Sequence, residues 1–167
     1  MAQQIELSIS GGAFVPQART PVEAEFLSNA ESNVESNVES NVERWAATVL
    51  AATEPCLIIN TEGQIAAVSA AGCELLGLDK PAEAVGQKLT EAISLIDFTA
   101  NAGALEEPEA GNIPPLLAVR SERLARGLMR VVPEPGRPPV TVDAIATPLS
   151  DGEKILGSLT FLSAVRY

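Results

Sequence analysis

The chain has 167 residues, of which 46% are hydrophobic, and it carries a formal net charge of −11 with no histidine. This length and hydrophobic fraction suffice for one ordinary globular domain with a real core. The negative charge argues against binding to nucleic-acid phosphates, and the absence of histidine excludes a histidine-containing catalytic triad, histidine metal ligands, a histidine-ligated haem and a phosphoacceptor histidine.

Membrane insertion and secretion are not indicated by the sequence. The longest apolar stretches run only a few residues, as in Cys56–Ile59, whereas a spanning helix needs about 20. The first ten residues lack the pattern of a secretory signal. The sequence therefore predicts a cytoplasmic protein with no membrane partner. Cys56 and Cys73, the two cysteines, each lie in an apolar run and are predicted to be reduced core residues.

Residues 1–19 have the composition of an arm. The stretch Ile5–Ser10 alternates apolar and polar residues, and Gly11, Gly12 and Pro16 follow it. This pattern predicts a flexible arm or a docked strand that is mobile until it docks.

Residues 20–54 are predicted to form a long flanking helix. Thr20 is predicted to cap the helix, with Pro21 at its first position and Glu23 completing a capping box. After Pro21, no further Gly or Pro occurs before Pro55. A four-residue Ser-Asn-Val-Glu repeat gives this helix a narrow valine stripe.

Such a helix is marginal alone and needs a partner surface, either a second copy or the sheet of its own domain. The alternative is a partly disordered acidic linker. The candidate dimer-interface residues, on the helix and on the last strand, are Phe26, Leu27, Val34, Val38, Val42, Trp45, Val49 and Leu162.

Residues 55–167 alternate between strand and short-helix patterns. The first strands are predicted as a hairpin closed by Thr61–Gly63, and a helix capped by Ser69 with Gly77 near its end follows. The predicted elements are strands Cys56–Asn60 and Gln64–Ser69, helices Ser69–Leu78, Pro81–Ile93 and Ile113–Arg126, a mobile loop at Asn101–Asn112, and strands Leu128–Pro133, Pro139–Pro148 and Lys154–Val165.

Two of these strands are apolar at consecutive positions, in Cys56–Ile59 and Leu159–Leu162. Because successive strand residues face opposite sides, both faces of the sheet must carry apolar groups. The outer face therefore needs a cover, which the upstream helix or a two-fold dimer would supply.

The order of elements and several short motifs resemble the PAS domain family over roughly Trp45 to Val165. Leu57–Ile65 reads as the opening hairpin with its Asn-x-x-Gly-x-Ile run, and Gly86–Leu89 is similar to the family's Gly-x-x-Leu step. Ala70–Leu78 is similar to the following helix, although the family's Asn and aromatic positions are altered. Val140–Leu149 and Gly157–Leu162 resemble the last two strands. The resemblance implies an α+β fold, with a five-stranded antiparallel sheet and helices on one face.

In this family a ligand usually lies between the inner sheet face and the helices, so the resemblance implies a pocket for a small apolar ligand. The alternative is a filled core without a ligand. The candidate residues are Leu89, Ile93, Ile96, Phe98, Ile113, Leu116, Leu117 and Leu124. Cys73 lies in Ala-Gly-Cys-Glu rather than the Asn-Cys-Arg-Phe motif of flavin-adduct members, so no flavin adduct is expected. Because the chain has no histidine, neither a haem nor a metal is expected.

Arg120, Arg123 and Arg126 recur every three residues, which predicts a cationic flank on a helix. This flank could dock an anionic ligand or the Glu ladder of another subunit, or simply face solvent.

Two functions follow from the sequence. The first is a sensory module, not an enzyme, that forms a homodimer and controls an unidentified signalling partner protein. The second is a constitutive dimerisation or scaffold module with no ligand. An output on the same chain is not visible, so either the sequence is a fragment or the partner is a separate protein.

Overall fold

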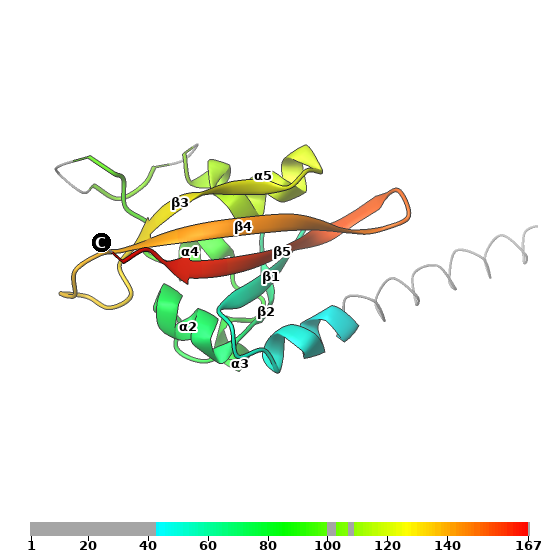
Figure 1. The fold of residues 1–167 in the computed structure, drawn as a ribbon, viewed down its shortest axis with the longest axis horizontal. Helices are drawn as coiled ribbons and strands as arrows, with labels where there is room; N and C mark the ends of the chain where they lie inside the picture. Colours follow the sequence, from blue (N-terminus) through cyan, green and yellow to red (C-terminus); the bar gives the residue numbers. More distant parts are fainter. Residues whose placement is uncertain (1–42, 100–102, 107–108, 167) are drawn as a thin grey trace, which may run out of the picture. The chain divides into compact units, whose positions relative to one another are not determined.

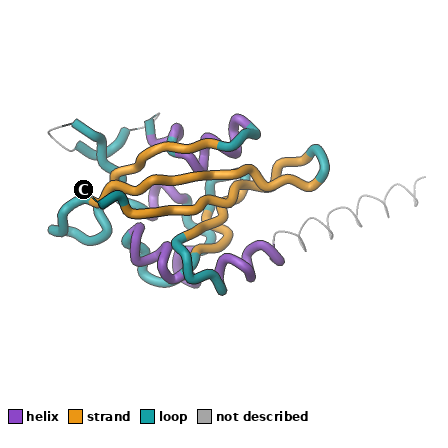
Figure 2. Tube along the Cα trace, in the orientation of Figure 1, coloured by secondary structure: helices purple, strands orange, loops and turns teal. Residues whose placement is uncertain are grey.

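A five-stranded antiparallel sheet dominates the computed structural model, which describes residues 43–99, 103–106 and 109–166. The strand order is β2-β1-β5-β4-β3 (Figure 1). Figure 2 shows that the β4–β5 hairpin extends beyond the other strands. The predicted strands and sheet are confirmed as β1 (Cys56–Asn60), β2 (Ile65–Val68), β3 (Ala125–Val131), β4 (Val140–Asp151) and β5 (Lys154–Ala164).

Short helices fill the chain between β2 and β3. The first begins as predicted, because the Ser69 side chain accepts a hydrogen bond from the Gly72 N–H at 3.0 Å, and it ends at Gly77, whose φ is 75°. The helices are α2 (Ala70–Leu76), α3 (Pro81–Ala84), α4 (Leu89–Ala92), the 3-10 helix η1 (Ala110–Asn112) and α5 (Pro114–Ser121).

The single helix predicted over Pro81–Ile93 is wrong, because the chain breaks between α3 and α4. Gly86 has a φ of 87°, and its N–H donates to the Ile65 carbonyl. The Ile65 N–H in turn donates to the Gln87 carbonyl. The break therefore lets these residues pair with the edge of β2, which stabilises them more than helix continuation would.

The helix α5 is also shorter than predicted, and the cationic flank does not form. Glu122, with a φ of 55°, ends the helix in a left-handed conformation. Arg120 remains on α5, but Arg126 belongs to β3 and forms an ion pair with Asp143 on β4, with 2.6 Å between Nη2 and Oδ2. The three-residue spacing of the arginines thus spans a helix, a turn and a strand.

The prediction that both sheet faces carry apolar groups is confirmed. Leu57 and Ile59 of β1 lie in the main core with the helices, and we call their side the inner face. Cys56 and Ile58 point the opposite way, into a smaller outer cluster. Within the sheet, β1 lies between β2 and β5, so both of its edges are paired. Apolar groups also cover both of its faces, and its side chains are therefore buried.

Helical residues 43–50 supply part of the outer cover. Val49 is only 2% exposed and packs with Cys56, Ile58 and Ala67 in the outer cluster. The helix ends at Leu50, four residues before the predicted bound at residue 54, and its last turn tightens through a bond from the Ala52 N–H to the Val49 carbonyl. The predicted arm, the start of the helix and its valine stripe lie outside the described residues.

Candidate functional site

The centre of the inner face is closely packed by α5. Ala118 of α5 and Ala146 of β4 are both fully buried, and together with Ala125 they form an alanine cluster. A Cβ on Gly127 would lie 3.3 Å from the Pro114 side chain. Small residues therefore bring α5 close to β3 and β4, and this part of the core is filled by the protein itself.

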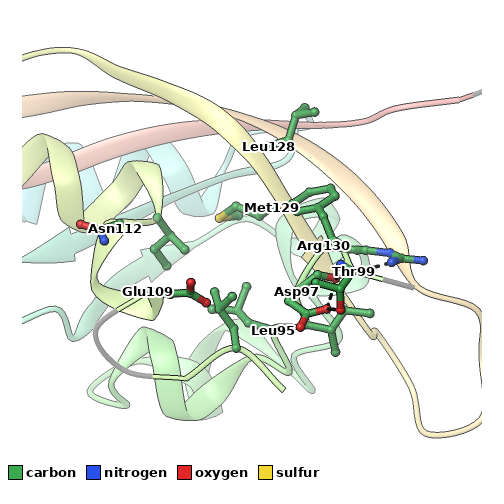
Figure 3. Close-up of a pocket in the computed structure, with 12 residues that line it drawn as sticks. Leu95, Asp97, Thr99, Glu109, Asn112, Leu128, Met129 and Arg130 are labelled. Atoms are coloured by element: carbon green, nitrogen blue, oxygen red, sulfur yellow. Dashed lines mark hydrogen bonds between the residues drawn. The ribbon is translucent and has the colours of Figure 1, made fainter. Parts of the chain in front are cut away.

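A groove lies beside this packing, where the edge of β3 meets the residues that precede α5. Its volume is about 610 Å³, which falls in the range of small-molecule sites. We call it the edge groove, and Figure 3 shows the side chains around it. Its walls are formed by Leu95, Ile96, Asp97, Phe98, Thr99, Leu105, Glu109, Asn112, Ile113, Leu128, Met129 and Arg130.

Backbone pairing holds one wall of the edge groove against β3. Leu95 forms a bridge with Val131, and the Ile96 N–H donates to the Arg130 carbonyl at 2.9 Å. On its other side, the Leu95 segment is paired again, since the Leu105 N–H donates to the Leu95 carbonyl at 3.0 Å. The wall is therefore a segment that isolated bridges hold beside β3.

The polar groups of the edge groove lie in two sets, with Asp97, Thr99 and Arg130 on one side and Glu109 and Asn112 on the other (Figure 3). The Asp97 carboxylate accepts hydrogen bonds from the backbone N–H and the hydroxyl of Thr99, at 3.0 and 2.7 Å. Asn112 accepts one from Arg120 at 2.7 Å. The groove thus combines a buried apolar floor with a polar rim, which suits non-covalent binding of a mainly apolar molecule.

The structure distributes the predicted ligand residues over several places. Ile96, Phe98 and Ile113 line the edge groove. Leu89 and Ile93 are buried in the main core, and Leu117 packs on the alanine cluster. Leu116 lines a smaller, more polar cleft with Lys88 and Arg120, and Leu124 is 65% exposed in the turn before β3.

Sequence reasoning missed four apolar residues of the edge groove, namely Leu95, Leu105, Leu128 and Met129. The sequence carried a usable signal for Met129, which faces the core, because Met129 and Val131 alternate with the charged Arg130 in β3. Leu95 and Leu105 carried no such signal, because their place depends on pairing with each other and with β3.

The predicted dimer-interface residues also lie in different parts of the molecule. Among the described ones, Trp45 is half exposed on residues 43–50, whereas Val49 is already buried in the outer cluster. Leu162 is 4% exposed and faces the main core, so it does not reach the outer face. Its neighbour Phe161 does, because successive residues of a strand point to opposite faces. Phe26, Leu27, Val34, Val38 and Val42 lie outside the described residues.

The outer face carries an exposed apolar patch on β3, β4 and β5, which we call the outer patch and define as Leu128, Ile145 and Phe161. Ile145 and Phe161 lie opposite each other in the β4–β5 pairing. All three side chains are exposed. The Arg126–Asp143 ion pair lies beside them on the same face, because Arg126 is opposite Ile145 and Asp143 is opposite Leu128. An apolar patch with a charged rim is typical of a protein interaction surface.

Both cysteines are free and buried, as predicted, and neither lines the edge groove. Burial raises the pKa of the Cys56 and Cys73 thiols, so little reactive thiolate forms near neutral pH. Over the described residues, no group of three or more acidic or cysteine side chains could hold a metal ion. Within the same residues no helix has the length and apolarity to span a membrane.

Comparison with known proteins identifies the family. The sequence model of the PAS fold matches residues 43–163, and the chain therefore belongs to the PAS family. This fold is typical of sensory modules in signal transduction. The comparison with curated proteins found no match.

Solved structures agree with this fold. The PAS domain of a Colwellia psychrerythraea protein is 14% identical with a TM-score of 0.52, covering 74% of this chain and 95% of that one. The PAS domain of Bordetella pertussis BvgS is 12% identical with a TM-score of 0.51, covering 76% and 87%. The Vibrio cholerae VqmA dimer is 16% identical with a TM-score of 0.52, covering 74% and 51%, so this chain spans about half of VqmA. At these identities the likeness shows the fold alone.

Proposed function

We propose that the chain is a regulatory sensor that binds a small, mainly apolar molecule in the edge groove, dimerises, and thereby controls a partner protein in the cytoplasm. The PAS fold supports a sensory role. The observation that carries the proposal is the edge groove itself, with its volume of about 610 Å³ and its buried floor of Leu95, Ile113 and Met129.

Ligand binding in this proposal is non-covalent and needs no cofactor. The two thiols lie away from the groove, and the sequence has no histidine to ligate a haem. Asp97 is already hydrogen-bonded to Thr99, which favours a role in holding the wall rather than in acid–base chemistry. A regulatory rather than catalytic role follows.

A change in the sheet reaches the upstream helix through the segment that joins them. The Ser69 hydroxyl donates to the Glu54 carbonyl at 2.8 Å, and the Leu162 N–H donates to the Pro55 carbonyl at 2.9 Å. These bonds fix Glu54 and Pro55, in the segment that follows the helix, to the cap of α2 and to β5. Ligand-dependent shifts between these elements would therefore alter the direction of the helix, which is the proposed output.

Dimerisation is proposed through the upstream helix together with the outer patch. The helix covers the β1 side of the outer face, whereas Phe161 and Ile145 remain exposed. A second copy placed on this face would bury the outer patch and the half-exposed Trp45.

A constitutive dimerisation module without a ligand is the second candidate. The specific observation that favours it is the alanine cluster, because α5 fills the centre of the inner face. The outer patch would then be the whole functional surface.

Native mass spectrometry of the freshly purified full chain separates the two. The sensor predicts a dimer that retains a small molecule, and Leu105→Trp, which fills the edge groove, would lose that mass. Val85→Trp is the matched control, since Val85 is exposed and lies away from both the groove and the proposed dimer surface. A ligand-free dimer that takes up no apolar compound from a screened set supports the scaffold, and a monomer at micromolar concentration contradicts both.

A further inference from the structure

A second cleft opens between three segments that are distant in the sequence. Its walls come from the β1–β2 turn, from the start of α4, and from η1 together with α5. We call it the polar cleft, and its volume of about 360 Å³ falls in the range of small-molecule sites. It shares no lining residue with the edge groove.

Hydrogen bonds and close packing position the walls of the polar cleft. The Asn60 side chain accepts a hydrogen bond from the Glu62 N–H at 3.0 Å, which fixes the β1–β2 turn. The Leu89 N–H donates to the Gly63 carbonyl at 2.9 Å and joins the start of α4 to this turn. A Cβ on Gly63 would lie 2.9 Å from Leu116 Cδ2, so α5 packs directly on the turn. The fold itself therefore holds the three walls together.

Arg120 brings an uncompensated positive charge to the polar cleft. Its guanidinium donates to the Asn112 side-chain oxygen at 2.7 Å and to the Gly111 carbonyl at 3.4 Å. Both acceptors are neutral, and no carboxylate in the part of the chain that the structure describes forms an ion pair with Arg120. The two bonds orient the guanidinium, and its remaining N–H donors suit the two oxygens of a carboxylate.

The opposite charge lies on another wall of the polar cleft. Glu62, in the β1–β2 turn, has no ion pair with any residue of the described ranges. The other two charged residues that line the cleft, Lys88 and Glu91, pair with each other, with 3.9 Å between Nζ and Oε1. One positive group and one negative group, Arg120 and Glu62, therefore stay available to a ligand.

This pair of charges favours a ligand that carries both signs. An anion alone would be repelled by Glu62, and a cation alone would be repelled by Arg120, because like charges in one small site oppose each other. A zwitterion satisfies both groups, with its carboxylate on Arg120 and its ammonium on Glu62. Leu116 lies one helical turn before Arg120 on the same face of α5, where it can contact a short apolar group.

We propose that the polar cleft is a second binding site, which takes a small zwitterion of the class of free α-amino acids with short apolar side chains. This site does not depend on ligand binding in the edge groove. A compound that binds only the edge groove shifts the amide signals of Leu128 and Met129, whereas a ligand of the polar cleft shifts those of Gly63 and Gly111. The failure of one site is therefore distinguishable from the failure of the other.

An amide NMR titration of the full chain with L-alanine, L-valine and L-leucine in turn tests the proposal. We expect at least one of them to shift the Gly63 and Gly111 amides saturably, with a dissociation constant of about 1 mM or tighter. Arg120→Gln and Glu62→Gln should each weaken this binding by at least about tenfold, because each removes one charge-assisted hydrogen bond. Both residues are exposed, so the variants should keep the wild-type amide spectrum outside the cleft.

Matched controls remove the same charges elsewhere on the surface. Arg123 and Glu74 are exposed and do not line the polar cleft, so Arg123→Gln and Glu74→Gln should bind with the wild-type dissociation constant. The site is contradicted if these controls weaken binding as much as Arg120→Gln and Glu62→Gln do. It is also contradicted if none of the three amino acids gives a saturable shift, or if the shifts are confined to the edge groove.

Two analogues of leucine test the need for both charges. Isocaproate lacks the ammonium group and isoamylamine lacks the carboxylate, so each should bind at least about tenfold more weakly than the best of the three amino acids. Binding of isocaproate as tight as that of the amino acid would show that the carboxylate suffices, and binding of isoamylamine as tight would show that the ammonium suffices. Either result overturns the assignment of the polar cleft to a zwitterion.

Discussion

Ile145 and Phe161 lie directly opposite each other on β4 and β5, on the sheet face away from α5, with 36% and 52% of their surfaces exposed. Opposed apolar side chains on neighbouring strands contact each other, and a partner that covers both removes a single continuous surface from water. This pair is therefore the centre of the proposed dimer contact.

Phe161→Ser should weaken self-association by at least about tenfold, since the loss of one large buried apolar side chain costs about 2 kcal/mol in an interface. Sedimentation velocity over a concentration series measures the dissociation constant. Val85→Ser is the control, because Val85 is a comparably exposed apolar residue in the segment that pairs with β2 at the opposite edge of the sheet. An unchanged dissociation constant in Phe161→Ser removes the outer patch from the interface.

Ser69→Ala should lower the free energy of unfolding by about 2–4 kcal/mol. The Ser69 hydroxyl accepts hydrogen bonds from the Cys56 and Gly72 N–H groups and donates to the Glu54 carbonyl, and the residue is fully buried. Urea denaturation measures the change as a shift of the midpoint at constant slope. Ser121→Ala, which removes one exposed bond to the Leu117 carbonyl, should change the stability by less than about 1 kcal/mol. Equal effects of the two variants would contradict the role of Ser69.

Gly77→Ala should be far more damaging than Gly86→Ala. Both glycines have a positive φ, but a Cβ on Gly77 would collide with the Pro133 backbone, whereas a Cβ on Gly86 meets open space. We expect a loss of about 3 kcal/mol or more at Gly77 and about 1 kcal/mol at Gly86. Thermal unfolding of the two variants checks this order, and similar melting temperatures would show that the contact with Pro133 relaxes freely.

The Arg126–Asp143 pair gives the stability an acid-sensitive component. The Arg126 guanidinium donates hydrogen bonds to Asp143 and holds the pKa of that carboxyl below its ordinary value. A lowered pKa stabilises the fold above the ordinary carboxyl pKa of about 4, and this contribution disappears as the pH falls through the lowered value. The melting temperature of Asp143→Asn should therefore differ more from the wild type at pH 7 than at pH 2.5.

The effect must be small, because the Arg126 side chain is largely exposed to solvent and water screens the pair. An NMR titration provides the direct measurement, in which the Asp143 pKa should rise toward its ordinary value in Arg126→Gln. A pKa that does not change in this variant would rule out the arginine as the cause.

The two cysteines should react slowly with a thiol reagent in the folded chain. Burial raises the pKa of both thiols and restricts access to them. The reaction at pH 8 should be much faster in urea, with two thiols modified per chain. Rapid modification of one thiol under native conditions would indicate local opening of the segment that carries it.

Several elements could be predicted from the sequence because they depend on local hydrogen bonds. The caps of α2 need only Ser69 and Gly77, and the β1–β2 hairpin needs only a turn with Gly63, whose φ is 77°. The consecutive apolar residues in β1 and β5 also predicted apolar groups on both faces, since strand residues point to alternate sides.

Features that depend on contacts between distant residues could not be predicted from the sequence. The helix predicted over Pro81–Ile93 breaks because Gly86 pairs with Ile65, and the predicted arginine flank divides because Arg126 enters a strand beside Asp143. In each case a contact between distant segments stabilises the observed conformation by more than the local helix propensity favours the predicted one.

The sequence alone determined the α+β class, the order of the strands along the chain and the absence of histidine chemistry, because these depend on composition and on patterns within a few residues. Only the tertiary structure decided where a groove exists. The alanine cluster brings α5 onto the sheet and fills the centre of the inner face, while Leu95 and Ile96 pair with β3 and leave the edge groove beside it. The filled centre and the open groove both arise from contacts between segments that are far apart in the chain. A local sequence pattern does not determine the free energies of such contacts.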